Sequence, residues 1–455
     1  MAVLERIVDA VNSVVWSPAL IALLLIGGLY FTIRTRFVQI RHLRNMAKFL
    51  FSPRDGGSVQ GMTSFQSFCL ALSGRVGTGN IVGVASAIAI GGPGSVFWMW
   101  VIAIVGAATA FVESTLAQLY RFKSDGIWKG GPACYIEKGL GQRWLGVIFA
   151  LLTVVGYGLL LSMVQANGAS SAFENSFGFR PIYVGLAIVV LLALVIFGGL
   201  GRIAKFASVV TPIMALGYII LSVVVVCINI SEVPHAFASI FKGAFGIGPA
   251  FAGMVGSAIS MGVKRGLFSN EAGQGGGAIV SASTSIDHPA KQGLVQSFSV
   301  YIDTIVVCTA TALMILCTGS HANPALDGNF VGTTQAAIDT VFMGWGNIFV
   351  TIALAFFTFT TIVAYDVYAE SSISYLFEPY KGAGARTAEK ISIILYRLLL
   401  FVTVAVGACT QAGVAWTCGD IGVGITTWIN IIVLIILCPK AAASLKDFEA
   451  SLRKK

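Results

Sequence analysis

Two clusters of glycine and small polar residues interrupt apolar segments of the chain, and their composition suits the binding of a small polar solute. The first cluster spans residues 74–80 (GRVGTGN), and the second spans residues 266–273 (GLFSNEAG). Each Gly costs about 1 kcal/mol of helix propensity relative to Ala, so these clusters favour an unwound backbone. At membrane depth such backbone is tolerated only inside protein or along a water-filled cavity. Close helix packing through the GxxxG pair Gly79 and Gly83 is the alternative.

Ten charged residues fall within apolar segments, where charge is costly and by default marks function. Structural ion pairs are the alternative, and we favour them for Glu113 and Arg397, whereas both interpretations stay open for Glu271. Arg75 lies in the first cluster and is expected to neutralise an acid from a facing helix. The acids are Glu113, Glu271, Asp303, Asp366, Glu370 and Asp420, and the cations are Arg75, Lys264, Arg265 and Arg397.

Hydroxyl and amide side chains mark two further places in apolar segments. Thr360 and Thr361 follow Thr358, and adjacent hydroxyls with freed carbonyls form an oxygen-only site suited to Na⁺. Bonding of these hydroxyls to the carbonyls of their own helix explains them equally well. Gln165 and Asn167 are amides in a long uncharged stretch, and interhelical hydrogen bonds are the alternative there.

The composition requires a membrane protein. Of 455 residues, 56% are hydrophobic and 11% are charged, against roughly 25% charged in soluble domains, and the mean hydropathy is +0.85. Long uncharged stretches exclude a nucleic-acid binder despite the net charge of +9. The eight Cys and four His show no metal-ligand spacing, and the His residues are expected to be solvated loop residues.

Eleven segments are long enough to cross a bilayer core, which needs roughly 20 apolar residues per helix. They are residues 16–33, 62–90, 95–119, 144–173, 181–200, 206–230, 248–284, 292–318, 344–376, 391–411 and 414–438. Of the 29 Lys and Arg residues, 22 fall in loops on one side and three on the other. The positive-inside rule therefore places the N-terminus outside and the C-terminus in the cytoplasm, with the basic stretch 34–54 on the inner leaflet, where anionic lipids attract it.

The two glycine clusters open two similar blocks of five spans, and an odd number of crossings inverts the second block. Interrupted helices at matching positions of inverted halves indicate a transporter with a site near the midplane. We expect an all-α polytopic protein with a 5+5 inverted repeat and one additional N-terminal span. The four expected segments are residues 1–60 (amphipathic helix, peripheral span and basic linker), 61–230 (first repeat), 231–438 (second repeat) and 439–455 (basic tail).

At these residues the sequence resembles the alanine or glycine:cation symporter family, within the amino acid–polyamine–organocation superfamily with its LeuT-like fold. The resemblance runs from about residue 20 to 438. Its motifs are ALSGRVGTGNIVGVASAIAIGGPGSVFWMW (71–100), KGGPACYIEKGL (129–140), RGLFSNEAGQG (265–275), HPAKQG (288–293), YIDT (301–304) and, more loosely, FTFTTI (357–362) and the stretch 396–420.

The resemblance implies Na⁺-coupled uptake of alanine or glycine, with serine as a further candidate, across a bacterial inner membrane. Na⁺ would be the coupling ion, without an organic cofactor, and neither nucleic acid nor an obligate protein partner is expected. Its Na⁺ site would comprise Thr360 and Thr361 with the backbone carbonyls of Arg75 and Gly77. Its substrate region corresponds to Gly77, Thr78, Gly79, Asn80, Gln165, Phe268, Ser269 and Asn270. Free N–H groups at a half-helix N-terminus suit the substrate carboxylate.

The chain departs from the family pattern after the Thr pair, where the family usually has a Trp. Tyr365 stands there and would enlarge the substrate pocket, while Asp366 adds a proton or cation site. An H⁺-coupled or divergent-substrate transporter that uses Asp366 or Glu271 is therefore the alternative function. The sequence contains no Walker A motif, which argues against an ATP-driven pump. It also contains no HExxH motif or paired-His metal site, which argues against a membrane-embedded enzyme.

Overall fold

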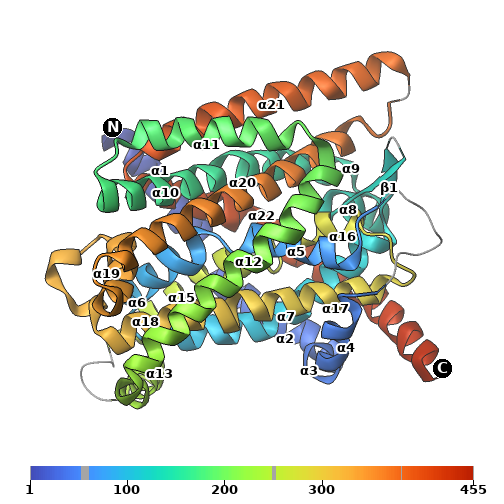
Figure 1. Cartoon of the computed structure of the whole chain (residues 1–455). Helices are drawn as coiled ribbons and strands as arrows, with labels where there is room; N and C mark the ends of the chain where they lie inside the picture. Colours follow the sequence, from blue (N-terminus) through green and yellow to red (C-terminus); the bar gives the residue numbers. More distant parts are fainter. Residues whose placement is uncertain (1, 53–60, 125, 248–252, 381, 454–455) are drawn as a thin grey trace.

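A computed structural model describes residues 2–52, 61–124, 126–247, 253–380 and 382–453 as a bundle of helices, most of which run along one direction (Figure 1). Helices dominate because lipid offers no partner for backbone N–H and C=O groups, which must be satisfied within each segment. Among these residues, eight helices are long and apolar enough to cross a membrane, and one bent pair adds a ninth. The two chain ends lie at opposite ends of the bundle (Figure 1).

The first helices precede the paired halves. The amphipathic helix expected at the N-terminus is α1, which packs against α22. Between α1 and the next helix, the indole N–H of Trp16 donates to the carbonyl of Asp420 at 2.8 Å. The helices of this part are α1 (Ala2–Val15), α2 (Pro18–Arg34), α3 (Val38–Arg41) and α4 (Leu43–Phe49).

The first half begins with a broken span, in which two helical pieces meet at 52°. A short antiparallel hairpin, with Lys123 opposite Trp128, connects two helices at the end of the bundle that also holds the C-terminus (Figure 1). The elements are α5 (Ser64–Arg75), the π-helix η1 (Gly79–Gly83), α6 (Val84–Gly91), α7 (Ser95–Leu119), β1 (Phe122–Ser124), β2 (Ile127–Lys129), α8 (Pro132–Leu140), α9 (Arg143–Thr153), the π-helix η2 (Val154–Leu161), α10 (Ser162–Phe177), α11 (Pro181–Ile196) and α12 (Gly199–Ile228).

The second half begins with another broken span. Its elements are the 3₁₀-helix η3 (Ile230–Glu232), α13 (Val233–Phe245), α15 (Val255–Asn270), α16 (Gly276–Ala282), α17 (Pro289–Val300), the π-helix η4 (Tyr301–Cys308), α18 (Thr309–Thr318), the 3₁₀-helices η5 (Ser320–Ala322) and η6 (Pro324–Leu326), α19 (Phe330–Phe342), α20 (Trp345–Phe377), α21 (Ala383–Cys409) and α22 (Ala412–Arg453). The central helix α7 packs against α15 and α17, and α10 packs against α20 and α21.

The helices follow the predicted spans with a few differences. Two of the eleven fall outside the apolar helices counted above: α11 has only 16 residues, and α15 with α16 forms two pieces separated by five residues. The sequence analysis did not predict α13 and α19, which lie in stretches between spans. Nor did it predict the π-helical turns, because hydropathy does not distinguish i→i+5 from i→i+4 hydrogen bonding.

Candidate functional site

The first break lies where α5 gives way to η1. Thr63 and Gln66 form a capping box that starts α5, and the helix ends at Arg75. Gly77 belongs to the non-helical link, and a Cβ atom added there would lie 2.7 Å from Gln165 Oε1 and 2.9 Å from Thr361 Oγ1. Only a glycine lets the link approach these two side chains so closely. The cluster therefore unwinds the helix, as predicted, and its glycine at position 77 also allows the non-helical link to lie close to α10 and α20.

The second break separates α15 from α16. Glu271 ends α15 with a left-handed φ of 55°, and Gly273 and Gly275 follow with φ of 93° and 103°. Residues that carry a side chain rarely adopt such positive φ values, which explains why Gly273 and Gly275 are glycines. A Cβ atom on Gly273 would also lie 2.5 Å from the Ile431 side chain. Both predicted breaks are therefore confirmed as interruptions of the helix.

Asp303, on η4, joins the two breaks. Its Oδ1 accepts a hydrogen bond of 2.7 Å from Asn80 Nδ2 in the first break, and its Oδ2 accepts one of 2.7 Å from Ser269 Oγ in the second. Thr304 Oγ1 donates to the same Oδ2, also at 2.7 Å. The carboxyl group is fully buried. Sequence analysis identified Asp303 only as a coupling or structural charge, and the structure places it between the two predicted halves of the substrate region.

Gln165 and Phe268 complete the enclosure of the first break. Gln165 Oε1 accepts from the backbone N–H of Thr78 at 2.9 Å and from its hydroxyl at 3.1 Å. The Phe268 ring packs on Trp416 with ring centres 5.0 Å apart, and a Cβ on Gly79 would lie 3.0 Å from that ring. The predicted substrate residues are all buried, so the structure is closed around them.

The second break carries an unused donor. Asn270 accepts from the backbone N–H of Ala272 through Oδ1 at 3.0 Å. Its buried Nδ2 has no hydrogen-bond partner among the described residues. An amide donor left free in a closed, buried site is available to a ligand oxygen.

The Thr pair divides into one structural and one candidate ligand residue. Thr360 Oγ1 donates to Phe356 and Phe357 carbonyls of its own helix at 3.0 and 3.1 Å. Thr361 Oγ1 instead crosses to the first break and donates to the carbonyls of Ser73 at 2.7 Å and Val76 at 3.3 Å. The carbonyls that meet Thr361 are thus those of Ser73 and Val76. The carbonyls of Arg75 and Gly77, which were expected at the Na⁺ site, are not among these acceptors, and the Na⁺ site itself stays a prediction.

Tyr365 belongs to a cluster of three buried tyrosines. Its ring centre lies 5.2 Å from that of Tyr157 and 5.8 Å from that of Tyr368. The Tyr157 hydroxyl accepts from the Gly276 N–H at 3.2 Å, and the Tyr368 hydroxyl donates to Glu271 Oε2 at 3.4 Å. Tyr365 therefore lies beside the second break, with two tyrosines that the sequence analysis did not single out.

Two expectations about buried charges are wrong. Among the described residues Arg75 forms no ion pair; it donates instead to Gln296 Oε1 at 3.2 Å and to Ser299 Oγ. Glu113 accepts from the Gly273 N–H at 3.2 Å and from Asn430 Nδ2 at 3.3 Å, again without an ion pair. Neutral groups contact both charges: acceptors on α17 bind the Arg75 guanidinium, and donors of the second break and of α22 bind one oxygen of Glu113. Spacing along the sequence could not reveal these partners.

The other buried charges do form ion pairs. Arg397 binds Asp366 through both oxygens, at 2.8 and 3.1 Å, and also Glu370 at 2.8 Å. The predicted pairing of Arg397 is confirmed, and both oxygens of Asp366 are occupied. On α15, Arg265 binds Asp420 at 2.8 and 3.1 Å, and Lys264 lies 2.6 Å from the same carboxylate.

His42 corrects the view of the histidines as solvated. It is buried, and its Nε2 lies 3.0 Å from Glu449 Oε1 on α22. His288 caps α17 by accepting from the Ala290 N–H at 3.1 Å, and its Nε2 lies 3.2 Å from Asp447 Oδ2 on α22. Both residues hold the end of α22 to the helices beside it.

A helical bundle in which two half-helices break against each other defines a secondary transporter with a LeuT-like fold. The structure of MhsT in complex with L-phenylalanine shares this fold, with a TM-score of 0.59 over 86% of this chain and 99% of that one, at 12% identity. The whole chain, residues 1–455, matches the sodium:alanine symporter family, and the protein therefore belongs to it.

Two relatives from Bacillus subtilis are similar over nearly the full length. A putative sodium/proton-dependent alanine carrier protein is 49% identical over 454 residues, which cover 97% of this chain and 92% of the relative. A probable sodium/glutamine symporter is 40% identical over 446 residues, which cover 98% and 91%. The family and these relatives are transporters.

Proposed function

We propose that this protein couples the influx of Na⁺ to the uptake of a small neutral amino acid, with alanine, glycine and serine as the candidates. The observation that carries the proposal is the meeting of two unwound half-helices in a closed site, where Asn80 and Ser269 share the carboxylate of Asp303. The names of the relatives, an alanine carrier and a glutamine symporter, support an amino-acid substrate. Binding and release need no covalent step and no organic cofactor.

The substrate carboxylate would take backbone N–H groups of the first break. In the closed structure these donors are occupied, because the Gly77 N–H donates to Asn80 Oδ1 at 3.0 Å and the Thr78 N–H donates to Gln165 Oε1. Substrate would displace these two amide oxygens, while the free Nδ2 of Asn270 offers a third donor. The Ser269 hydroxyl would accept from the ammonium group, and Phe268 would cover a small apolar side chain.

Na⁺ would bind where Thr361 meets the end of α5. The hydroxyl of Thr361 and the carbonyls of Ser73 and Val76 are hard oxygen ligands that already converge. Because this site and the substrate site share the first break, Na⁺ and substrate would each favour the binding of the other.

Proton coupling is the second candidate, and Glu271 is the residue that favours it. Its Oε1 is buried without a hydrogen-bond partner among the described residues. Asp366, the other candidate, has both oxygens bound to Arg397 and is a weaker choice.

The membrane arrangement is also a proposal. The protein would span the inner membrane of a bacterium with its N-terminus outside and its C-terminus in the cytoplasm, because 22 of its 29 Lys and Arg residues lie on one side. The segments 1–60, 61–230, 231–438 and 439–455 would remain its four functional parts.

Uptake into proteoliposomes tests the proposal with a labelled panel of glycine, both alanines, both serines and glutamine. An inward Na⁺ gradient should stimulate uptake of glycine or alanine, and a proton gradient without Na⁺ should not.

Thr361→Ala should raise the Na⁺ concentration needed for half-maximal uptake more than Gln165→Ala does. Thr403→Ala is the matched control, since this half-buried residue donates to a carbonyl of its own helix. Equal and Na⁺-independent losses in both site variants would contradict the ion site. Proton-driven uptake that Glu271→Gln abolishes would establish the second candidate instead.

A further inference from the structure

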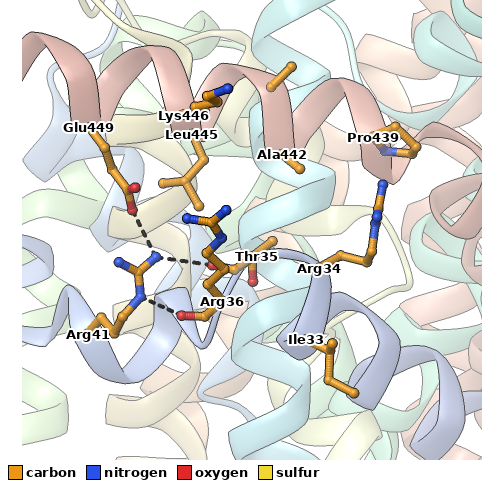
Figure 2. Close-up of a pocket in the computed structure, with 11 residues that line it drawn as sticks. Ile33, Arg34, Thr35, Arg36, Arg41, Pro439, Ala442, Leu445, Lys446 and Glu449 are labelled. Carbon is orange, nitrogen blue, oxygen red and sulfur yellow. Dashed lines mark hydrogen bonds and ion pairs between the residues drawn. The ribbon is translucent and has the colours of Figure 1, made fainter.

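A basic pocket lies at the end of the bundle that holds the C-terminus, well away from the two breaks. It is a cavity of about 450 Å³ between the end of α2, the following α3 and the last turns of α22. Figure 2 shows its side chains on these two facing segments. The lining residues include the cations Arg34, Arg36, Arg41 and Lys446, and the acid Glu449.

The cations of the pocket are mostly uncompensated. Arg41 donates to Glu449 Oε1 at 2.8 Å and to the backbone carbonyls of Thr35 and Arg36. Glu449 also meets His42, so its charge is already shared. Within the described part of the chain, Arg34, Arg36 and Lys446 have no carboxylate within 4.0 Å. Three exposed cations therefore line one cavity in which none of them is paired with an acid of the described chain.

The backbone is strained where it forms the pocket. Arg36 and Phe37 both adopt a left-handed conformation, with φ of 54° and 59°, although neither is a glycine. This turn redirects the chain from α2 into α3 and keeps Arg34, Arg36 and Arg41 on the side facing α22 (Figure 2). Strained backbone of this kind persists where the surrounding structure enforces it and often marks a binding site.

The pocket lies where two membrane helices pass from apolar to polar sequence, which indicates the level of the lipid headgroups. The apolar sequence of α2 ends at Arg34, and the apolar run of α22 ends at Cys438, just before Pro439 and Lys440. Both helices thus leave the hydrocarbon region at the pocket. Ile33 lines the pocket with 57% of its surface exposed, and Phe37 and Ile40, which follow in the chain, are 49% and 59% exposed. Exposed apolar side chains next to a cluster of guanidinium groups match a molecule with a phosphate head and acyl chains.

We propose that this pocket binds the phosphate of an anionic phospholipid headgroup. The guanidinium groups of Arg34 and Arg36 would hold phosphate oxygens in the paired geometry that arginine favours, and Lys446 would add a point charge from α22. Basic pockets between membrane helices hold anionic headgroups in this way. Such a lipid would tie the peripheral helix α2 to α22, which belongs to the second half. The proposal rests on membrane insertion alone and does not depend on the identity of the transported solute.

Lipid binding to the purified full-length chain in detergent tests the proposal. Phosphatidylglycerol and phosphatidylcholine with identical acyl chains are titrated, and bound lipid is counted by native mass spectrometry alongside the unfolding temperature. The triple variant Arg34→Gln, Arg36→Gln, Lys446→Gln should lose about tenfold or more of its affinity for phosphatidylglycerol, since each basic residue near the headgroups adds attraction. Arg41 and Glu449 are left intact because they pair with each other.

The matched control removes the same charge elsewhere. Arg202→Gln, Lys205→Gln, Lys390→Gln neutralises three exposed cations of α12 and α21, outside the pocket, and should leave the affinity within about twofold of the wild type. Equal losses in both triple variants, or no loss in the pocket variant, would overturn the proposal. Stabilisation by soluble glycerol 1-phosphate as strong as that by phosphatidylglycerol would reassign the site to free phosphate esters and overturn the lipid assignment.

A cross-linking experiment on the wild-type chain tests the site without variants, which could misfold. A photoactivatable phosphatidylglycerol analogue, cross-linked in vesicles and mapped by peptide mass spectrometry, should label residues 33–41 and 439–449. Adducts confined to other segments would refute the site independently of the variants.

Discussion

At the scale of single residues, Asp303 is the group on which the candidate site depends. It accepts from one side chain of each break, so the two half-helices are held by one carboxylate. Hydrogen bonds to an ionised acceptor are roughly twice as strong as neutral ones. We therefore expect the charge of Asp303, and not only its shape, to set the relative positions of Asn80 and Ser269.

Asp303→Asn preserves the size of the side chain but leaves one oxygen in place of two. It cannot accept from Asn80 and Ser269 together, and we expect substrate affinity to fall about tenfold or more. Equilibrium binding of labelled alanine to the purified protein measures the change. Thr304→Val is the control, since Thr304 bonds to the same carboxylate but belongs to neither break. An affinity equal to that of the control would show that the carboxylate serves the fold alone.

The sequence predicts the breaks well and their partners poorly, for a physical reason. A glycine cluster unwinds its own helix, which is a local effect, and the interruptions at residues 76–78 and 271–275 overlap the clusters 74–80 and 266–273. Asn80 and Asp303 are separated by 223 positions along the chain, and Glu113 and Asn430 by 317. Such pairs are set by helix packing and by the π-helical turn of η4, neither of which has a sequence signature. The Na⁺ site stays a prediction; the structure shows that the Thr361 hydroxyl reaches two carbonyls at the end of α5, those of Ser73 and Val76.

At the scale of secondary-structure elements, buried charges hold α20 to α21. Asp366 is fully buried, and Arg397 supplies two hydrogen bonds to it from the neighbouring helix. Glu370, one turn further along α20, also binds Arg397 and lies 3.3 Å from Lys129 of the hairpin. These contacts connect α20, α21 and the hairpin. They also pair the negative charge of Asp366, the residue that departs from the family pattern, with a cation.

Arg397→Leu removes that cation and leaves the Asp366 charge buried without a partner. Loss of one member of a buried pair typically costs about 3–5 kcal/mol, and we expect the free energy of unfolding in detergent to fall by this order. Lys390→Leu is the control on the same helix, because Lys390 is exposed. Adding Asp366→Asn to the Arg397→Leu variant should restore part of the stability. If Arg397→Leu unfolded no more easily than the control, the pair would contribute nothing to the packing of α20 on α21.

At the scale of the whole molecule, charge is distributed unequally between the two ends of the bundle. The hairpin, α3 and the end of α22 lie at one end, and α1 begins at the other (Figure 1). The loops that the sequence assigns to one side carry 22 of the 29 Lys and Arg residues. Between the two ends the residues predicted to bind substrate are buried. The cluster of Lys264, Arg265 and Asp420 lies on the α1 side, because Trp16, directly after α1, bonds to the Asp420 backbone.

The charge asymmetry predicts which end faces the cytoplasm, and cysteine labelling in intact cells can determine it. Cys409 is exposed at the end of α21 on the side away from the basic loops, so a membrane-impermeant maleimide should label it from outside. Arg453→Cys, placed at the end of α22 in a chain whose other cysteines are changed to alanine, should react only after the cells are permeabilised. Both labelling experiments need a chain with a single cysteine, since Cys227 is also exposed and would react with the maleimide. The reverse pattern would invert the protein in the membrane. It would also move the proposed phospholipid pocket to the outer leaflet, where the same cations would meet a different lipid population.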